Sequence, residues 1–237
     1  YLNDAFYAQG KIVGAQLLWH GKLSQFPFTQ NQGIFQASVA IQNADFSFSR
    51  SWPSVNGLDI DLSFENLGLS MQSSAATIGS LEVLDLKGYI PLFSAGADLI
   101  IEATATGSGD DVSKLLTNSS LSDGLGKILS TDIIVINDLT TRLSLYIPLD
   151  APQQTSASGI VTLVDNFVQI PSLLIDLENV DGRITFDNDN VTFSALQANL
   201  LGQAIVADFN GANINNEYRF DVSVDGNWDL KPLFPFV

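Results

Sequence analysis

Alternation of apolar and polar residues with a period of two dominates this chain. The segment 57–64 places four apolar residues on one side and acidic or polar residues on the other; the apolar set is Leu58, Ile60, Leu62 and Phe64. Because successive side chains of a β-strand point to opposite faces, the pattern predicts strands with one apolar and one solvated face. The alternation recurs at 142–147, 183–186, 190–195 and 218–226. One solvated face is typical of antiparallel sheets, so the predicted class is mainly β and antiparallel.

One segment, residues 109–130, breaks this alternation. Its apolar residues have helical spacing, and side chains that can cap a helix precede them. Asp110 or Asp111 would cap a first helical segment, and Ser120 or Ser122 would cap a second one. We expect one broken helix or two short ones there, covering the open end or one face of the sheet.

The strand pattern is used twice. Leu58 aligns with Val180 and Phe64 with Phe186, at a separation of 122 residues, while Phe46 aligns with Phe167 after a slip of one residue. The runs ENLG at 65–68 and DNDN at 187–190 are predicted hairpin tips, because Asn, Asp and Gly tolerate positive φ. Chance similarity between two β-meanders is the alternative.

A repeated unit instead predicts an elongated sheet that grows by adding units. The predicted division is a first β repeat at 1–108, a helical insert at 109–130 and a second β repeat at 131–237.

Composition excludes several classes of function. The 237 residues carry a formal net charge of −16, which repels phosphate backbones, so no nucleic-acid partner is expected. The absence of cysteine rules out disulfides, zinc-thiolate sites and thiol catalysis. It fits both the cytosol and cysteine-free bacterial envelope proteins.

Catalytic and metal-binding constellations are not predicted. His20 is the only histidine and lies beside no nucleophile. The pair Asp59 and Asp61 shares one strand face and is interpreted as solvated charge rather than as a glycosidase pair. The run 187–190 lacks the rest of a calcium loop, which leaves a weak turn-bound cation as an alternative there. No catalytic residue, metal or cofactor is therefore assigned. Exposed tryptophans would favour a sugar-binding alternative, and the candidates are Trp19, Trp52 and Trp228.

Two long runs resemble a known family. Residues 25–64, with Gln25 in place of an acidic residue, and residues 182–209, with the turn Leu201, Gly202 and Gln203, are similar to segments of the AsmA-like bacterial envelope proteins, to which TamB is also similar. The resemblance covers roughly residues 17–228, and its motifs are structural rather than catalytic.

The resemblance implies an elongated, curved antiparallel sheet that forms a periplasmic groove for phospholipid. It further implies an inner-membrane anchor helix outside this chain, which begins at Tyr1 without a methionine and is interpreted as an internal piece. The expected partners are phospholipid acyl chains, the inner membrane through that helix, and envelope proteins of unknown identity.

The apolar face is the predicted lipid-binding site. Acyl chains are suitable cover for a row of aliphatic and phenyl side chains, since burial of apolar area needs no specific headgroup contact. The predicted lipid-binding residues are Leu58, Ile60, Leu62, Phe64, Ile184, Phe186, Phe193, Phe220, Val222 and Val224. The same row would also serve as the core of a β-sandwich adhesion or scaffold module, and that alternative stays open. A glycan-active enzyme is a more distant third.

Overall fold

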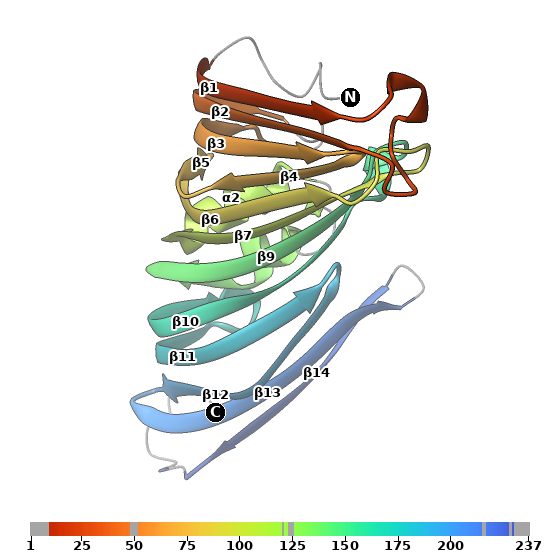
Figure 1. Cartoon of the computed structure of the whole chain (residues 1–237). Helices are drawn as coiled ribbons and strands as arrows, with labels where there is room; N and C mark the ends of the chain where they lie inside the picture. Colours follow the sequence, from red (N-terminus) through yellow and green to blue (C-terminus); the bar gives the residue numbers. More distant parts are fainter. Residues whose placement is uncertain are drawn as a thin grey trace. The chain divides into compact units, whose positions relative to one another are not determined.

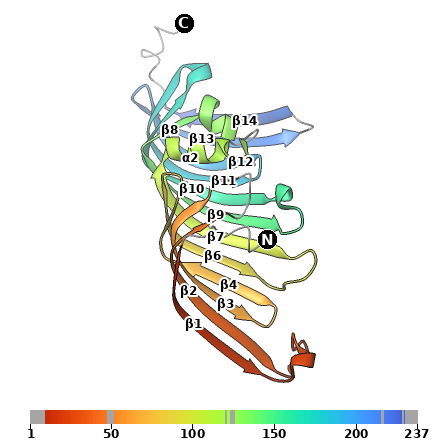
Figure 2. The ribbon, with the colours of Figure 1, turned by 90° about the horizontal axis from the view of Figure 1, so that it is seen from above.

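The computed structural model describes residues 10–47, 52–119, 121–122, 126–214, 217–227 and 229. Its strands form a 14-stranded sheet in the order β1-β2-β3-β4-β6-β7-β9-β10-β11-β12-β13-β14 (Figure 1; Figure 2). Off this path, β5 pairs with β3 and β6, and β8 pairs with β10. The predicted class, mainly β and antiparallel with short helices near 110–130, is confirmed.

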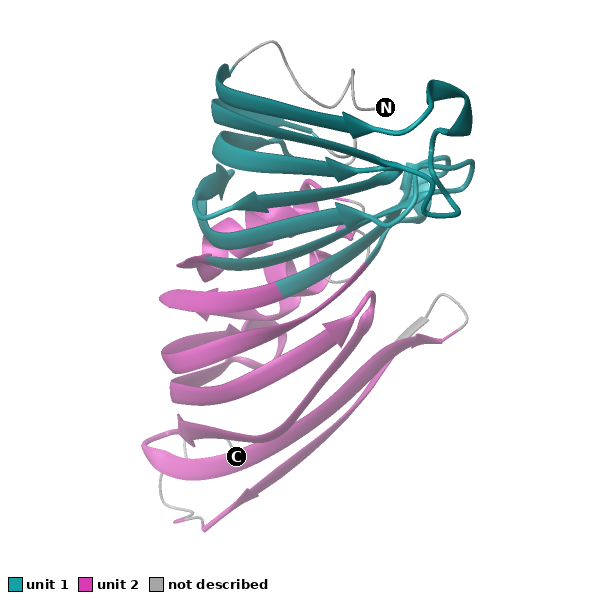
Figure 3. Cartoon of the chain, in the orientation of Figure 1, with its two compact units in different colours: residues 1–105, 143–156 teal, residues 106–142, 157–237 magenta. Residues whose placement is uncertain are grey.

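The chain divides into two compact units (Figure 3). The first consists of residues 1–105 and 143–156, and the second of residues 106–142 and 157–237. The division into groove repeats at 1–108, 109–130 and 131–237 stays a prediction. The first unit contains β1 (Lys11–His20), η1 (Leu23–Gln25), β2 (Ile34–Phe46), β3 (Val55–Glu65), β4 (Gly68–Ser73), β5 (Ala76–Ile78), β6 (Leu81–Ile90), most of β7 (Asp98–Ser108), the second half of β9 (Asp138–Pro148) and η4 (Pro152–Gln154).

The second unit contains the helical insert and the later strands. Its elements after β7 are α2 (Gly109–Thr117), η3 (Ile128–Asp132), β8 (Ile134–Ile136), the start of β9, β10 (Ser156–Ile170), η5 (Pro171–Leu173), β11 (Ile175–Asp187), β12 (Asn190–Leu200), β13 (Gln203–Ile214) and β14 (Glu217–Gly226).

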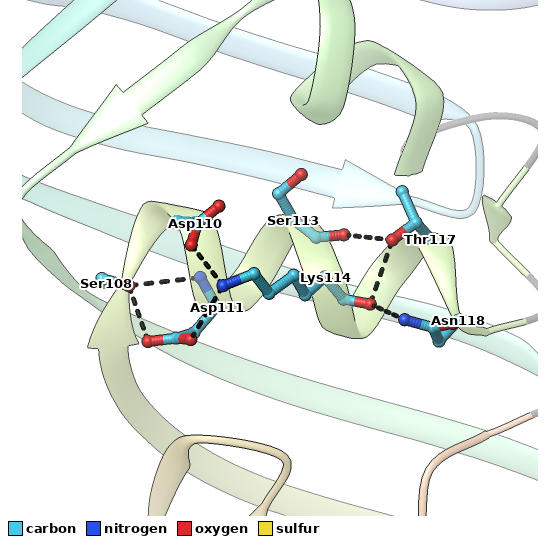
Figure 4. Close-up of polar contacts among 7 residues, drawn as sticks. All are labelled: Ser108, Asp110, Asp111, Ser113, Lys114, Thr117 and Asn118. Atoms are coloured by element: carbon cyan, nitrogen blue, oxygen red, sulfur yellow. Dashed lines mark hydrogen bonds and ion pairs between the residues drawn. The ribbon is translucent and has the colours of Figure 1, made fainter.

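Helix α2 starts at a serine cap. The Ser108 hydroxyl accepts a hydrogen bond from the Asp111 N–H at 3.2 Å (Figure 4). The prediction of Asp110 or Asp111 as the cap is wrong, because both lie inside the first turn, where their charge favours the positive end of the helix dipole. Asp110 also accepts a hydrogen bond from Lys114, which raises the pKa of that ammonium. Of the two residues predicted for the second cap, Ser120 lies outside the described residues, and the Ser122 N–H donates to the Ser119 carbonyl at 3.2 Å.

An asparagine holds the same hairpin tip in each unit. The Asn66 side-chain oxygen accepts the Phe35 N–H at 3.0 Å, and the Asn188 oxygen accepts the Ala157 N–H at 2.9 Å. Both asparagines have a left-handed backbone conformation, with φ of 49° and 51°. The predicted tips at 65–68 and 187–190 are therefore confirmed, and the two sets of contacts lie 122 residues apart.

The strand registers repeat at the same spacing, but without the predicted slip. Phe46 pairs with Val55, and Val168 pairs with Leu177, so each partner of the second pair lies 122 residues after its counterpart. The match of Phe46 with Phe167 is wrong because it rested on a shared aromatic ring rather than on position along the strand. A shift of one residue in a strand moves a side chain to the opposite face.

The units differ where the insert joins the sheet. Asn166 is fully buried, and Ala44 holds the corresponding position in the first unit. The Asn166 side-chain oxygen accepts the Val164 N–H at 2.8 Å, and its amide donates to the carbonyls of Ile136 and Asp138, both at 3.1 Å. Asn166 thus ties the short strand β8 and the start of β9 to β10.

Replacement of Asn166 tests this tie. Asn166→Ala removes three hydrogen bonds between a buried side-chain amide and the backbone, and we expect a loss of about 1–3 kcal/mol in the free energy of unfolding. Urea denaturation followed by circular dichroism measures the change. The matched control is Asn210→Ala on the exposed side of β13, for which a change within about 0.5 kcal/mol is expected. Equal losses in the two variants would contradict the assigned role.

Candidate functional site

Side chains of the second unit form apolar rows that cross four strands on one face of the sheet. Residues directly opposite each other on antiparallel strands share a face, so the registers define the rows. The first row is Phe186, Val191, Gly211 and Phe220, the second is Ile184, Phe193, Phe209 and Val222, and the third is Leu196, Ala207 and Val224. The six residues predicted in this part of the chain are thus brought together on one face.

Exposure along these rows rises toward β14. Phe186 on β11 is 5% exposed, whereas Phe220, at the β14 end of the same row, is 63% exposed. Val222 and Val224 are also exposed, while Leu196 and Ala207 are buried. The face therefore changes from a packed core into an open apolar surface within four strands.

Phe209 connects these rows and was missed from the sequence. Its ring stacks on Phe193 at a centroid distance of 5.2 Å and on Phe220 at 5.9 Å. The three rings form a ladder across β12, β13 and β14. Alternation of Ile205, Ala207 and Phe209 in β13 is the signal that would have identified it.

The first unit shows the same arrangement, but its exposed end lies on the first strand, β1, rather than on the last. One row consists of Leu17, Ala37, Phe64, Leu69 and Ile90, and the next of Ala15, Val39, Leu62 and Met71. Leu17 on β1 is 72% exposed, while Ile90 on β6 is buried. Of the residues predicted here, Leu58, Ile60 and Leu62 are buried and Phe64 is half-buried.

An aromatic cluster closes the hairpin between β1 and β2. The Trp19 ring lies 5.5 Å from Phe26, 5.4 Å from Phe28 and 5.8 Å from Phe35. Phe28 is buried at its centre. Trp52 is also buried and so offers no ring surface to a sugar, while Trp228 lies outside the described residues.

Asp59, interpreted from the sequence as solvated charge, also accepts a backbone hydrogen bond, and so does its counterpart Asp181. Asp59 accepts the Asn43 N–H at 2.9 Å, and Asp181, located 122 residues later, accepts the Asp165 N–H at 3.1 Å. Alternation places these carboxylates correctly on the solvated face but gives no sign of the hydrogen bonds, which depend on strand pairing.

Metal-binding geometry is absent from the described part of the chain. No group of three or more His, Asp or Glu side chains is placed to hold an ion there. In the turn at 187–190, Asn188 uses its oxygen for the Ala157 N–H and donates its amide to Asp187 at 3.1 Å. His20 is exposed at the end of β1. What the described residues present is an apolar surface.

Comparison with known proteins identifies the family. A family model described as "YhdP protein" matches residues 1–237. The chain belongs to the YhdP family. It is 32% identical over 228 residues to "Intermembrane phospholipid transporter YhdP" of Escherichia coli (strain K12), an alignment that covers 96% of this chain and 18% of that protein. No solved structure matches the chain.

Membership of the YhdP family confirms the resemblance noted from the sequence. The name of the E. coli relative describes an intermembrane phospholipid transporter. Within the described residues, no helix is both long and apolar enough to cross a membrane.

Phe186 and Phe220 lie in the same row but differ in burial, so their replacement should change the free energy of unfolding by different amounts. Phe186→Ser removes a packed ring, and we expect a loss of about 3–5 kcal/mol in the free energy of unfolding. Phe220→Ser changes a mostly exposed ring and should cost less than about 1 kcal/mol. Chemical denaturation of both variants measures the contrast. A large loss in Phe220→Ser would mean that its ring is packed against protein in solution, and the surface at β14 would not be open.

Proposed function

We propose that this chain is a section of a periplasmic, bridge-like conduit that shields phospholipid acyl chains in an apolar groove on their way between the inner and outer membranes. The single observation that carries the proposal is an apolar face that opens at an edge strand. The name of the E. coli relative supports phospholipid as the cargo. The chain spans 18% of that relative, so the complete conduit, its inner-membrane anchor and its periplasmic location belong to the proposal as well.

The chemistry of the face suits acyl chains. Each methylene group taken from water into an apolar surface contributes about 0.8 kcal/mol, so ten methylenes supply about 8 kcal/mol before the cost of ordering the chain. Aliphatic and phenyl side chains make no directional bonds with methylenes. A tail can therefore move along such a face without breaking any specific contact.

The ten predicted residues divide into three roles. Phe220, Val222 and Val224 are exposed and would contact the lipid directly, together with Phe209. The half-buried residues Phe64, Ile184 and Phe193 would form the transition, and the buried residues Leu58, Ile60, Leu62 and Phe186 would support the surface from within the packed part of the same face.

A β-sandwich adhesion or scaffold module is the second candidate. It requires two sheets whose apolar faces close on each other. The described strands form one sheet, and no second layer of described residues covers the exposed side chains on β14. These observations favour the conduit.

Photo-crosslinking from β14 tests the proposal directly. A benzoyl-phenylalanine at position 220 should form phospholipid adducts in protein purified from bacterial membranes, while the same group at Ser223 faces the opposite side. We expect the adduct yield at position 220 to be at least about tenfold higher, because acyl chains avoid the polar face. Mass spectrometry of the adducts measures the yield. Equal or absent adducts, with a lipid-free native mass spectrum, would reject the conduit in favour of a structural module.

A charge on the open face should interfere with lipid binding. Val222→Asp places a carboxylate against the acyl chains, and we expect phospholipid bound per protein to fall at least about tenfold. Ser223→Asp is the matched control, since it adds the same charge to the neighbouring residue on the other face. Native mass spectrometry counts the bound lipid, and a thermal melt verifies that both variants fold. Equal losses in the two variants would assign the effect to net charge rather than to the apolar face.

A further inference from the structure

Three β-bulges in the sheet have the same construction. In each bulge, two residues of one strand lie opposite a single aspartate of the next strand, and the second of the two has a φ of 53°. The aspartate accepts the N–H of that left-handed residue. The pairs are Asn43 with Asp59 at 2.9 Å, Asp165 with Asp181 at 3.1 Å, and Ala195 with Asp208 at 2.8 Å.

The aspartate carboxylate stabilises each bulge. A bulge leaves one backbone N–H without a partner in the strand ladder and bends the strand. A residue other than glycine also pays a conformational cost at positive φ, and Ala195 has no polar side chain to offset it. A hydrogen bond from an N–H to a charged oxygen is among the stronger kinds in proteins. Without the aspartate, the unpaired N–H and the left-handed residue both lose this stabilisation, and the bulge becomes less stable.

All three aspartates lie on the face opposite to the apolar rows. Their strand neighbours Leu58, Val180 and Ala207 are buried, the first two completely, whereas Asp59 and Asp181 are exposed. In a sheet whose strands bend, side chains crowd together on the inner side of the bend. The complete burial of Leu58 and Val180 beside the bulges therefore indicates that the bend closes toward the apolar face.

We infer that Asp59, Asp181 and Asp208 are positioning residues for the apolar face: by capping the bulges they hold the bend that makes this face a trough for acyl chains. The inference rests on the proposed lipid-binding function and adds to it the residues that set the shape of the surface. Because the aspartates point away from the lipid, any effect they have on lipid binding passes through the backbone.

Amide hydrogen exchange tests the capping without any lipid. Asp59→Leu and Asp208→Leu remove the acceptor, while Asp59→Asn and Asp208→Asn keep a side-chain oxygen at the same place. We expect the amides of Asn43 and Ala195, measured by NMR in the 237-residue chain, to exchange at least about tenfold faster in the Leu variants. In the Asn variants the rates should stay within about threefold of the original chain. Unchanged rates in the Leu variants would overturn the capping role.

Lipid uptake tests the consequence for the trough. The probe is a photoactivatable phosphatidylethanolamine in phosphatidylethanolamine and phosphatidylglycerol vesicles, and the readout is labelled lipid per folded protein. We expect Asp208→Leu to lower uptake at least about threefold and Asp208→Asn to retain it. Should Asp208→Leu fail to fold, Ala195→Val and Ala195→Gly replace this pair. A β-branched residue resists positive φ while glycine accepts it, so only the valine variant should lose uptake.

The outcomes separate the two proposals. If the original chain takes up no lipid while the exchange results are as expected, the capped bulges stand and the lipid-binding function fails, and the positioning role fails with it. If the original chain takes up lipid and the Leu and Asn variants behave alike, either both reduced or both unchanged, lipid binding stands and the positioning role is overturned.

Discussion

A sheet with one apolar face must have that face covered, and the rest of this structure depends on how the cover is provided. The described strands pair into one antiparallel sheet, and the residues alternate strictly enough that almost all large apolar side chains of β3, β4 and β11 fall on one side. In each unit the apolar residues beside the bulges, Leu58 and Val180, are fully buried, and the face becomes exposed at an edge strand, β1 or β14. The exposed part of the face therefore results from strand position and not from a change in the sequence pattern.

Equivalent hydrogen bonds maintain this arrangement in both units. The asparagine at each hairpin tip and the bulge aspartates Asp59 and Asp181 recur at a separation of 122 residues. These groups satisfy backbone atoms at the points where the strand ladder is interrupted, which are the points where a long sheet loses pairing energy. A buried polar side chain, Asn166 in place of Ala44, occurs where the carbonyls of β8 and the start of β9 need a donor.

The sequence predicts the strands and their faces well because alternation is a local property. It places Phe186 and Phe220 on apolar faces, and the register then shows that they share one row. It fails for properties that depend on the partner strand: the aspartate caps, the stacking of Phe209 and the depth of burial of Leu58. The slip that matched Phe46 with Phe167 has a related origin, since the equivalence of Phe46 with Val168 appears only when each is seen opposite its partner, Val55 or Leu177.

A surface for transport has different requirements from a binding pocket. A pocket fixes its ligand with a few directional polar groups, whereas a mobile acyl chain needs adjacent positions of nearly equal free energy. In the proposed conduit, the ladder of Phe193, Phe209 and Phe220 would offer apolar contact across three strands, because apolar burial depends on area and not on direction. The aspartates that cap the bulges lie on the opposite face. A charged residue among the rows would create a local barrier to an acyl chain, and the capped bulges would let the strands bend without placing any polar group on the lipid side.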